Sequence, residues 1–375
     1  MPREPQPFKQ HFGPDLVADL ARRIGAVEPS FPQAAFVAAV ALQLEPLALK
    51  ARVAVIAAEL RAYLPPDYPA ALEVLLAILG PPLAENEGMF SDGWHVMPLA
   101  AFVEYYGLDH VEESLVAMHA ITQRHTAEYA IRPFLVRYPQ RILQTLQIWV
   151  NDPSFHVRRL VSEGTRPRLP WAARLPQFIA DPTPVLALLE HLKDDPSAYV
   201  RKSVANNLND IAKDHPDLAL ATLARWREGA SAERAWIVRH ALRTLVKQGH
   251  PVALELLGAG APRVTLESLE LTPLRVAVGG AVTLSVTLRS TAPSPQLLVV
   301  DYVLRMPGAR GAARAKVFKL RSQWLEPGAI LHVQKRHSFA PVGARPVYPG
   351  AHSITVQVNG VALGAVALEV EPGVK

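Results

Sequence analysis

A nine-residue pattern that occurs twice in the middle of the chain constrains its fold most. Residues 151–159 read N-D-P-S-F-H-V-R-R, and residues 194–202, displaced by 43 positions, read D-D-P-S-A-Y-V-R-K. A weaker copy, S-A-E-R-A-W-I-V-R-H, follows at residues 231–240. A turn with Asp and Pro, then a helix carrying Val-Arg one turn in, is typical of paired-helix HEAT-like repeats when it recurs about every 40 residues. Such repeats stack into an α-solenoid with a concave face.

The repeats place an arginine at each equivalent helix position. These arginines are Arg158, Arg201 and Arg239, and they would form a column on one side of the stacked helices. Two interpretations of the column remain open. The guanidinium groups could neutralise the phosphates of a polyanion, or they could tie neighbouring repeats together.

The character of the sequence changes after residues 258–262, which read G-A-G-A-P. Alternating and β-branched runs replace helical spacing, and Asn359-Gly360 is a strong hairpin signal. We predict strands at residues 275–278, 282–288, 297–305, 315–320, 330–339, 353–358 and 361–370. This pattern favours an immunoglobulin-like β-sandwich, although the cysteine pair of antibody domains is missing. The chain is therefore expected to be mainly α, with a HEAT-like-repeat α-solenoid at residues 1–262 and a β-sandwich at residues 263–375.

Positive charge is concentrated in two parts of the chain. The formal net charge is +5, but residues from Arg263 onward carry 13 Lys+Arg against 6 Asp+Glu, a net of +7. Residues 1–262 hold the other 26 basic and 28 acidic residues, a net of −2. Within them, residues 126–174 contain 8 arginines and 3 acids. Basic charge gathered in this way indicates a surface for a polyanion.

The residues themselves exclude several familiar kinds of site. Cysteine is absent, which excludes a disulfide framework, a thiol nucleophile and a cysteine-ligated zinc site. The sequence has no P-loop, H-E-x-x-H, G-x-S-x-G or G-x-G-x-x-G motif, and its 13 histidines show no metal-ligand spacing. No apolar run reaches the roughly 18 residues of a membrane helix, and no secretory leader is recognisable. We therefore expect a soluble intracellular protein that uses neither a metal nor an organic cofactor.

Residues 157–171, V-R-R-L-V-S-E-G-T-R-P-R-L-P-W, combine four arginines with one acid and one tryptophan. When the repeats are aligned by Val-Arg, Glu163 corresponds to Asn206 and Thr244, so the helix position repeats but the side chain does not. A packing role common to all repeats therefore does not explain Glu163. The alternative is an ion pair with Arg159 on the same helix face, which stabilises a helix by about 0.3–0.5 kcal/mol if exposed.

Two further candidates lie on either side of this repeat helix. Glu128, in H-T-A-E-Y-A-I-R-P-F, is expected in the first turn of a helix, where the helix dipole favours a carboxylate. A surface pair with Arg132 is the alternative for Glu128. Trp171 follows a Pro-rich loop beside Arg168, and it is a candidate platform for a base or a cation.

The second repeat helix contains unusual polar residues. Asn206 and Asp210 lie in S-V-A-N-N-L-N-D, a segment with three asparagines. Asparagine is a poor helix former, so three of them in one helix indicate either a functional site or a bridge between repeats.

Carboxylates in an arginine-lined concavity favour one kind of chemistry. Arginines bind phosphates and carboxylates repel them, so acids in the same place indicate that something positive is held there. An alkylated base is cationic and a good leaving group, and its sugar becomes oxocarbenium-like as the N-glycosidic bond breaks. A carboxylate stabilises that charge and positions or deprotonates the attacking water. An indole face attracts the cationic base.

Four long segments carry a family resemblance: T-A-E-Y-A-I-R-P-F at 126–134, H-V-R-R-L-V-S-E-G-T-R-P-R-L-P-W-A at 156–172, Y-V-R-K-S-V-A-N-N-L-N-D-I-A-K-D at 199–214 and R-H-A-L-R-T-L-V-K at 239–247. They resemble the AlkC branch of the AlkC/AlkD family of bacterial HEAT-like-repeat DNA glycosylases. P-F-K-Q-H-F at residues 7–12 is similar as well. The resemblance covers essentially the whole chain, including the appended immunoglobulin-like domain.

The resemblance implies a monofunctional glycosylase that excises cationic alkylated bases from double-stranded DNA and leaves an abasic site. Its substrates would be 3-methyladenine and, as a further candidate, 3-methylcytosine. The solenoid would grip the duplex through its backbone, without the full base flipping usual among base-modifying enzymes. We expect a monomer in the bacterial cytoplasm, associated with the nucleoid. The alternative from another class is a non-catalytic HEAT-repeat scaffold that binds DNA or a protein partner.

The resemblance also implies site residues. Glu128, Glu163 and Asp210 match the acids expected near the damaged nucleotide. Trp171, Arg159 and Arg166 match motif positions expected at the cleft. The set expected to bind substrate or DNA is completed by residues of the basic loop, the repeat helices and the sandwich: Arg168, Arg158, Arg201, Arg239, Asn206, Lys316 and Lys319.

Overall fold

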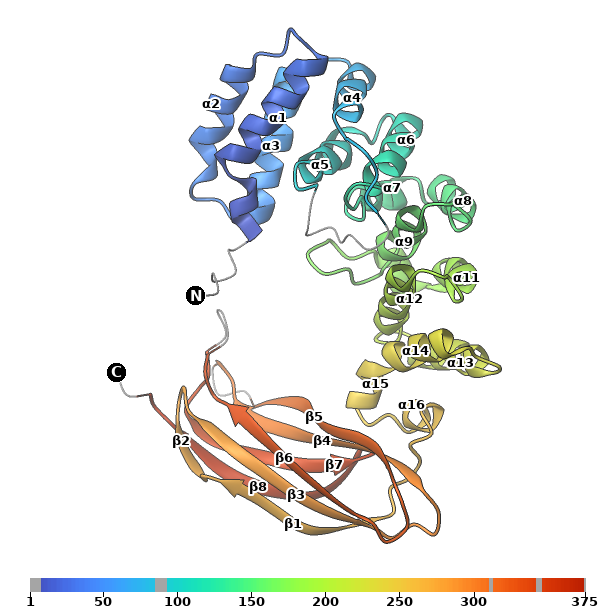
Figure 1. Cartoon of the computed structure of the whole chain (residues 1–375), viewed down its shortest axis with the longest axis vertical. Coiled ribbons are helices and arrows are strands. Elements are labelled where there is room, and N and C mark those ends of the chain that lie inside the picture. Colours follow the sequence, from blue (N-terminus) through green and yellow to red (C-terminus); the bar gives the residue numbers. More distant parts are fainter. Residues whose placement is uncertain (1–7, 85–92, 310–312, 342–345, 374–375) are drawn as a thin grey trace. The chain divides into compact units, whose positions relative to one another are not determined.

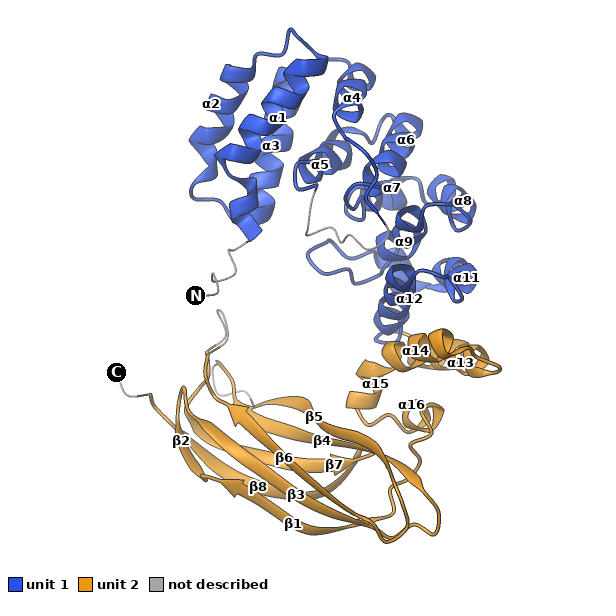
Figure 2. Ribbon diagram, viewed as in Figure 1, with its two compact units in different colours: residues 1–214 blue, residues 215–375 orange. Residues whose placement is uncertain are grey.

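The computed structural model describes residues 8–84, 93–309, 313–341 and 346–373, in which helices precede strands (Figure 1). Pro7 of the N-terminal motif at residues 7–12 lies outside these ranges. The chain divides into two compact units, residues 1–214 and residues 215–375 (Figure 2). The helices of the first unit are η1 Phe8–Phe12, α1 Pro14–Val27, α2 Gln33–Leu44, α3 Leu49–Tyr63, α4 Tyr68–Ala77, α5 Val96–Tyr106, α6 Val111–Thr122, α7 Ile131–Arg137, α8 Pro139–Trp149, α9 Phe155–Gly164, α10 Pro176–Ala180, α11 Thr183–Leu192 and α12 Ala198–Ile211.

The predicted repeats are confirmed as stacked helix pairs. Helices α8 and α9 form one pair, α11 and α12 form the next, and α9 packs directly against α12. Both helices contribute aliphatic side chains to the interior, with Val157 and Leu160 of α9 and Val200 and Val204 of α12 fully buried. Burial of apolar side chains between neighbouring repeats holds an α-solenoid together.

The Asp-Pro signature has a local structural role in both repeats. Asp152 Oδ1 accepts a hydrogen bond from the backbone N–H of Ser154 at 2.8 Å, and Asp195 Oδ1 accepts the same bond from Ser197 at 2.8 Å. The repeat arginine then returns to this turn. Arg158 Nη1 donates to the carbonyl of Asp152 at 2.8 Å, and Arg201 Nη1 donates to that of Asp195 at 2.7 Å. The turn therefore accounts for the spacing between Asp-Pro and Val-Arg in the sequence.

The second unit contains α13 Pro216–Arg227, α14 Ala232–Ala241, α15 Arg243–Lys247 and α16 Pro251–Leu256, followed by eight described strands. Helices end at Leu256 and strands begin at Val264, but α13–α16 group with the strands in one compact unit. The turn after α15 comes so close to the hairpin at Gly360 that a Cβ on Gly249 would lie 2.9 Å from the Cα of Gly360. Glycine at both positions permits this approach.

The strands form the predicted sandwich of two sheets. One sheet has the order β1-β3-β6 and the other β2-β8-β7-β4-β5, and residues of both sheets share one aliphatic core. Asn359 and Gly360 have φ of 45° and 78° and form the predicted hairpin turn between β7 and β8. The strands are β1 Val264–Thr272, β2 Arg275–Ala277, β3 Ala281–Ser290, β4 Gln296–Pro307, β5 Ala313–Leu325, β6 Ile330–Ser338, β7 Gly350–Val358 and β8 Val361–Glu371.

Strand β1 was absent from the seven strands that the sequence predicted. Its pairing with β3 shifts register between Leu266 and Ser268, so Glu267 is an extra residue in the ladder. Such a bulge breaks the alternation of apolar and polar residues by one position. The period-two signal that identifies strands is therefore lost across Val264–Thr272.

Asp301 makes the stability of the sandwich depend on pH. It lies buried in β4, and within the described ranges its carboxylate accepts no hydrogen bond. Desolvation raises the pKa of Asp301 to about 6, although Lys319 and Lys247 offset part of the effect. In the unfolded chain an aspartate titrates near about 3.9. Because the folded state binds this proton more tightly, the associated stability is present below about pH 4 and is lost as the pH rises through about 6.

We therefore expect Asp301→Asn to raise the free energy of unfolding of the sandwich by about 2 kcal/mol at pH 8 and to change it little near pH 4. Thermal unfolding of both full-length proteins at the two pH values measures this difference. An equal effect at both pH values would show that the carboxyl charge is not the cause.

Candidate active site

Three acids that lie far apart in the sequence meet in the first unit. Glu128 lies in the turn before α7, Glu163 in the last turn of α9 and Asp210 near the end of α12. Two arginines join them: Arg159 of α9 and Arg166 of the loop that follows α9. All five residues are buried. We call these five residues the acid–arginine cluster.

Glu163 is at the centre of the cluster. Its Oε1 accepts a hydrogen bond from Arg166 Nη1 at 2.7 Å, and its Oε2 accepts one from Ser203 Oγ at 2.6 Å. The intrahelical partner Arg159 lies further away, with Nη2 3.8 Å from Oε1. Burial raises the pKa of Glu163, but the charges of Arg159 and Arg166 outweigh burial, so the net pKa is below its usual value. Glu163 is therefore ionised at neutral pH despite being buried.

Glu128 does not occupy the position expected for it. Helix α7 begins only at Ile131, so Glu128 precedes the first helical turn, and the expected placement by the helix dipole is wrong. The alternative of a surface pair with Arg132 is also wrong, because Glu128 is buried and Arg159 Nη1 donates to its Oε2 at 2.9 Å. The hydroxyl of Thr126 donates to the same oxygen at 2.9 Å.

Asp210 closes the other end of the cluster. Its Oδ2 accepts a hydrogen bond from Arg166 Nε at 2.8 Å, and its Oδ1 accepts one from Lys213 Nζ at 2.7 Å. Arg166 thus holds Glu163 and Asp210 together through two edges of one guanidinium group. This planar, forked geometry is one that lysine does not provide.

Arg159 is the cation between Glu128 and Glu163, and its guanidinium lies over the ring of Tyr199 at 4.5 Å from the ring centroid. Desolvation lowers the pKa of Arg159, but the two carboxylates raise it by more, so the group remains charged. The cluster is therefore a fixed set of buried charges whose side chains already have their partners. Such an arrangement stabilises a charge that develops beside it without first reorienting solvent.

Known proteins are similar to this chain over most of its length. The sequence model of the family described as DNA alkylation repair enzyme matches residues 109–245, and that of the C-terminal Ig-like domain of the uncharacterised protein YhaZ matches residues 265–372. The uncharacterised protein YhaZ of Bacillus subtilis (strain 168) is 35% identical over 355 residues, which cover 94% of this chain and 96% of that protein.

A solved structure extends this likeness to three dimensions. It is the Pseudomonas fluorescens alkylpurine DNA glycosylase AlkC, bound to DNA containing an abasic site analogue. It is 41% identical and has a TM-score of 0.91, covering 97% of this chain and 99% of its own. The chain belongs to the AlkC family. The resemblance stated from the sequence segments is therefore confirmed, and with it the fold class of helical repeats followed by an immunoglobulin-like sandwich.

The AlkC-family motif at residues 156–172 ends in a loop that joins α9 to α10. Trp171 in this loop is 62% exposed and has a φ of 62°. Arg168, the other candidate there, pairs with both carboxylate oxygens of Asp214, at 2.7 and 2.5 Å. Of the loop residues predicted for the site, the structure thus joins Arg166 to the acids, pairs Arg168 with Asp214 and leaves the indole of Trp171 largely exposed.

The repeat arginines of this AlkC-family chain make structural contacts. Arg158 donates to both carboxylate oxygens of Asp195 in the next repeat, at 2.6 and 3.0 Å, as well as to its own Asp-Pro turn. For Arg158 these contacts match the alternative in which the arginine ties neighbouring repeats together, whereas Arg201 donates to the turn of its own repeat. Arg239 is exposed on α14 of the other unit, so its alignment with Arg158 and Arg201 stays a prediction.

The asparagine-rich segment of α12 serves partly as a bridge. Asn207 Nδ2 donates to the carbonyl of Ser162 at 2.8 Å and to the hydroxyl of Thr165 at 3.2 Å, which joins α12 to α9. Asn206, the residue chosen from the sequence, is half-buried on the same helix. The remaining candidates, Lys316 and Lys319, are exposed on β5, the last strand of the five-stranded sheet.

Arg132 is the most important residue that the sequence did not identify. It is buried, and its guanidinium donates to three carbonyls at or near the two ends of the loop between α9 and α10: those of Gly164 at 3.0 Å, Arg166 at 2.9 Å and Ala173 at 3.2 and 2.6 Å. Desolvation lowers the pKa of Arg132 to about 10, although nearby acids led by Glu128 oppose it, so the group is charged at neutral pH. The sequence offered no signal for these contacts, because the spacing of Glu128 and Arg132 suggested a pair between those two residues instead.

The described ranges contain no group of three or more histidines and acids arranged to hold a metal ion. Among the helices of those same ranges, none has the length and apolar character required to cross a membrane.

Proposed function

We propose that this protein is a DNA repair glycosylase that hydrolyses the N-glycosidic bond of cationic alkylated bases in double-stranded DNA. The observation that carries the proposal is Glu163, a buried and ionised carboxylate held by Arg166 and Ser203 at the centre of the acid–arginine cluster. The proposal is supported by the 41% sequence identity between this chain and an alkylpurine DNA glycosylase. The candidate substrates are 3-methyladenine and 3-methylcytosine.

In the proposed reaction the C1′–N bond breaks and its electron pair leaves with the base, which departs as a neutral molecule. The positive charge moves to the sugar, where the carboxylates of Glu163, Asp210 and Glu128 stabilise it. Water adds to C1′ and loses a proton, leaving an abasic site. A carboxylate oxygen can accept two hydrogen bonds, so Glu163 retains acceptor capacity for this water. The exposed indole of Trp171 offers a face to the cationic base or its neighbour.

We further propose a division of work within a monomer. The helical part, residues 1–262, would bind DNA and carry out catalysis, and the sandwich, residues 263–375, would add a basic surface. Because the proposed substrate is alkylated double-stranded DNA, we propose that the protein acts in the bacterial cytoplasm, in association with the nucleoid. Arg158, Arg201, Arg239 and Asn206 are proposed DNA contacts of the helical part, with Arg159, Arg166 and Arg168 nearer the lesion.

The proposal is tested by identifying the bases released from methylated duplex DNA by mass spectrometry. We expect 3-methyladenine in the supernatant and abasic sites in the DNA. A non-catalytic scaffold that binds DNA or protein would release no base at any enzyme concentration, and that result would overturn the proposal.

The basic surface of the sandwich gives a separate prediction. Lys316 and Lys319 are exposed on β5. If each contacts a phosphate, Lys316→Gln and Lys319→Gln should each reduce the slope of log affinity against log salt by about 0.9, with little change in the single-turnover rate of base release. Fluorescence anisotropy at several salt concentrations measures the slope. The uncharged neighbour Ser322, exposed on the same strand, provides the control Ser322→Ala; unchanged slopes in both lysine variants would remove this strand from the DNA-binding surface.

A further inference from the structure

The loop that carries Trp171 needs an external constraint. A bulky residue with a positive φ is uncommon because its Cβ approaches the backbone closely. Trp171 has a φ of 62°, and its side chain is 62% exposed. Packing of the indole therefore contributes little to holding this backbone conformation.

Two cations from other helices donate to the backbone of this loop. Arg132 of α7 holds its two ends through the carbonyls of Gly164, Arg166 and Ala173. Lys50 of α3 reaches the tip, because its ammonium donates a hydrogen bond to the carbonyl of Trp171 itself. Lys50 precedes Trp171 by 121 positions in the sequence, so this contact links the N-terminal helices to the proposed site.

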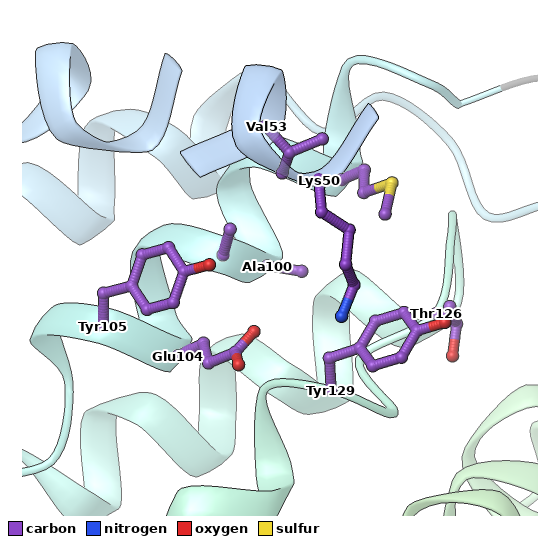
Figure 3. A pocket seen from close by; sticks show the side chains of 9 residues that line it. Lys50, Val53, Ala100, Glu104, Tyr105, Thr126 and Tyr129 are labelled. Atoms are coloured by element: carbon purple, nitrogen blue, oxygen red, sulfur yellow. The ribbon is translucent and has the colours of Figure 1, made fainter. Parts of the chain in front are cut away.

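A small pocket positions the ammonium of Lys50 (Figure 3). The ammonium lies over the ring of Tyr129, 4.6 Å from its centroid. The pocket has a volume of about 30 Å³, enough for about one water molecule, and the carboxylate of Glu104 lines it. Within the described ranges this carboxylate accepts no hydrogen bond. Burial raises the pKa of Glu104, while the charges of Lys50 and Arg132 oppose the increase.

The same pocket reaches the acid–arginine cluster. Thr126 lines it, and the hydroxyl of Thr126 donates to Glu128 at 2.9 Å. Tyr129 follows Glu128 directly and supplies the ring beneath Lys50. One turn of the chain thus positions both Glu128, a proposed catalytic acid, and Tyr129, whose ring lies beneath the ammonium of Lys50.

We propose that Lys50 is a positioning residue, which holds the backbone of Trp171 in its left-handed conformation and so presents the indole to the damaged nucleotide. Its ammonium acts on the protein backbone rather than on a DNA phosphate. The ring of Tyr129 and the carboxylate of Glu104 attract the ammonium and keep it within hydrogen-bonding reach of the Trp171 carbonyl. This inference rests on the proposed function for its effect on base release, but the effect on the loop is a property of the protein alone.

The variant Lys50→Met keeps an unbranched side chain only one atom shorter than lysine and removes its charge and donors. We expect faster amide hydrogen exchange in residues 165–175 of the DNA-free protein and unchanged exchange in α9 and α12. Lys50→Arg retains a cation that donates to carbonyls, and it should restore most of the protection. Arg61→Met is the matched control, since Arg61 of α3 donates to the carbonyls of Pro65 and Pro66. Unchanged exchange of residues 165–175 in Lys50→Met would overturn the proposal, whether or not the protein releases bases.

Kinetics with DNA distinguish positioning from a phosphate contact. Lys50→Met should lower the single-turnover rate of base release by about 10-fold, the loss expected for one hydrogen bond from a charged group. The salt slope of DNA binding should not change. In a Trp171→Ala background, Lys50→Met should lower the rate almost no further. Lys50 acts through the indole of Trp171, and that indole is already absent.

A salt slope lowered by about 0.9, together with an equal loss of rate in both backgrounds, would assign Lys50 to a phosphate and overturn the proposal. If the wild-type protein releases no base, the proposed function fails, and the hydrogen-exchange result still decides whether Lys50 holds the loop.

Discussion

Glu163→Gln is expected to lower the rate of base release by about 10²–10³-fold while leaving DNA affinity and folding close to wild type. Glutamine keeps the size of the side chain and can still bond to Arg166 and Ser203, because a hydroxyl both donates and accepts. Glutamine lacks the negative charge that, in the proposed reaction, stabilises the positive charge on the sugar. Single-turnover release from methylated DNA and fluorescence anisotropy measure the two quantities separately.

A matched control is available on the surface of the same unit. Glu112 pairs with Arg141 and its side chain is 66% exposed, so Glu112→Gln removes a charge from an ion pair without touching the cluster. Exposed ion pairs contribute about 0–1 kcal/mol, and we expect no change in rate. Full excision activity in Glu163→Gln would show that the Glu163 carboxylate is not needed for catalysis. The proposed role would then fall to Asp210 or Glu128.

Arg132→Met is expected to cause the largest loss of stability, about 3 kcal/mol or more in the free energy of unfolding. The substitution leaves the carbonyls of Gly164, Arg166 and Ala173 without their buried donor. An unsatisfied buried carbonyl costs about 1–3 kcal/mol, and partial relaxation of the loop reduces the sum. Thermal unfolding followed by the helical circular dichroism signal measures the loss.

Arg174→Met serves as the comparison for this effect, since Arg174 is exposed in the same loop and makes no hydrogen bond or ion pair within the described residues. Surface substitutions of this kind usually change stability by less than about 0.5 kcal/mol. Equal melting temperatures for Arg132→Met and the wild type would mean that the loop keeps its conformation without the guanidinium.

The sequence allowed prediction of features whose cause is local. The Asp-Pro turn and the Val-Arg that follows it lie within nine residues, so each repeat displays its whole signature. Glu163 could be selected because it departs from the pattern of its own repeats. Asp210 lies 47 positions after Glu163. The repeats predict that α9 stacks on α12, and this stacking brings the two acids together.

Features that depend on distant or irregular backbone could not be predicted in this way. Arg132 bonds to carbonyls that lie 32–41 residues further along the chain, and a carbonyl carries no residue-specific signal. Glu128 was identified, but its partner was not, because the choice between Arg132 and Arg159 depends on where α7 begins. Strand β1 escaped detection because one bulged residue cancels its alternation.

Asp195 serves two repeats, and this has a consequence for the spacing of the proposed catalytic acids. Asp195 closes the turn before α12 and also pairs with Arg158 near the start of α9, so it sets the register of one helix against the other. Asp210 lies about 18 Å along α12 from its first residue, at the opposite end of that helix from this contact. The separation of Glu163 and Asp210 is thus set in part by a side chain remote from both. Substitution of Asp195 would change the spacing of the proposed catalytic acids without replacing any of them.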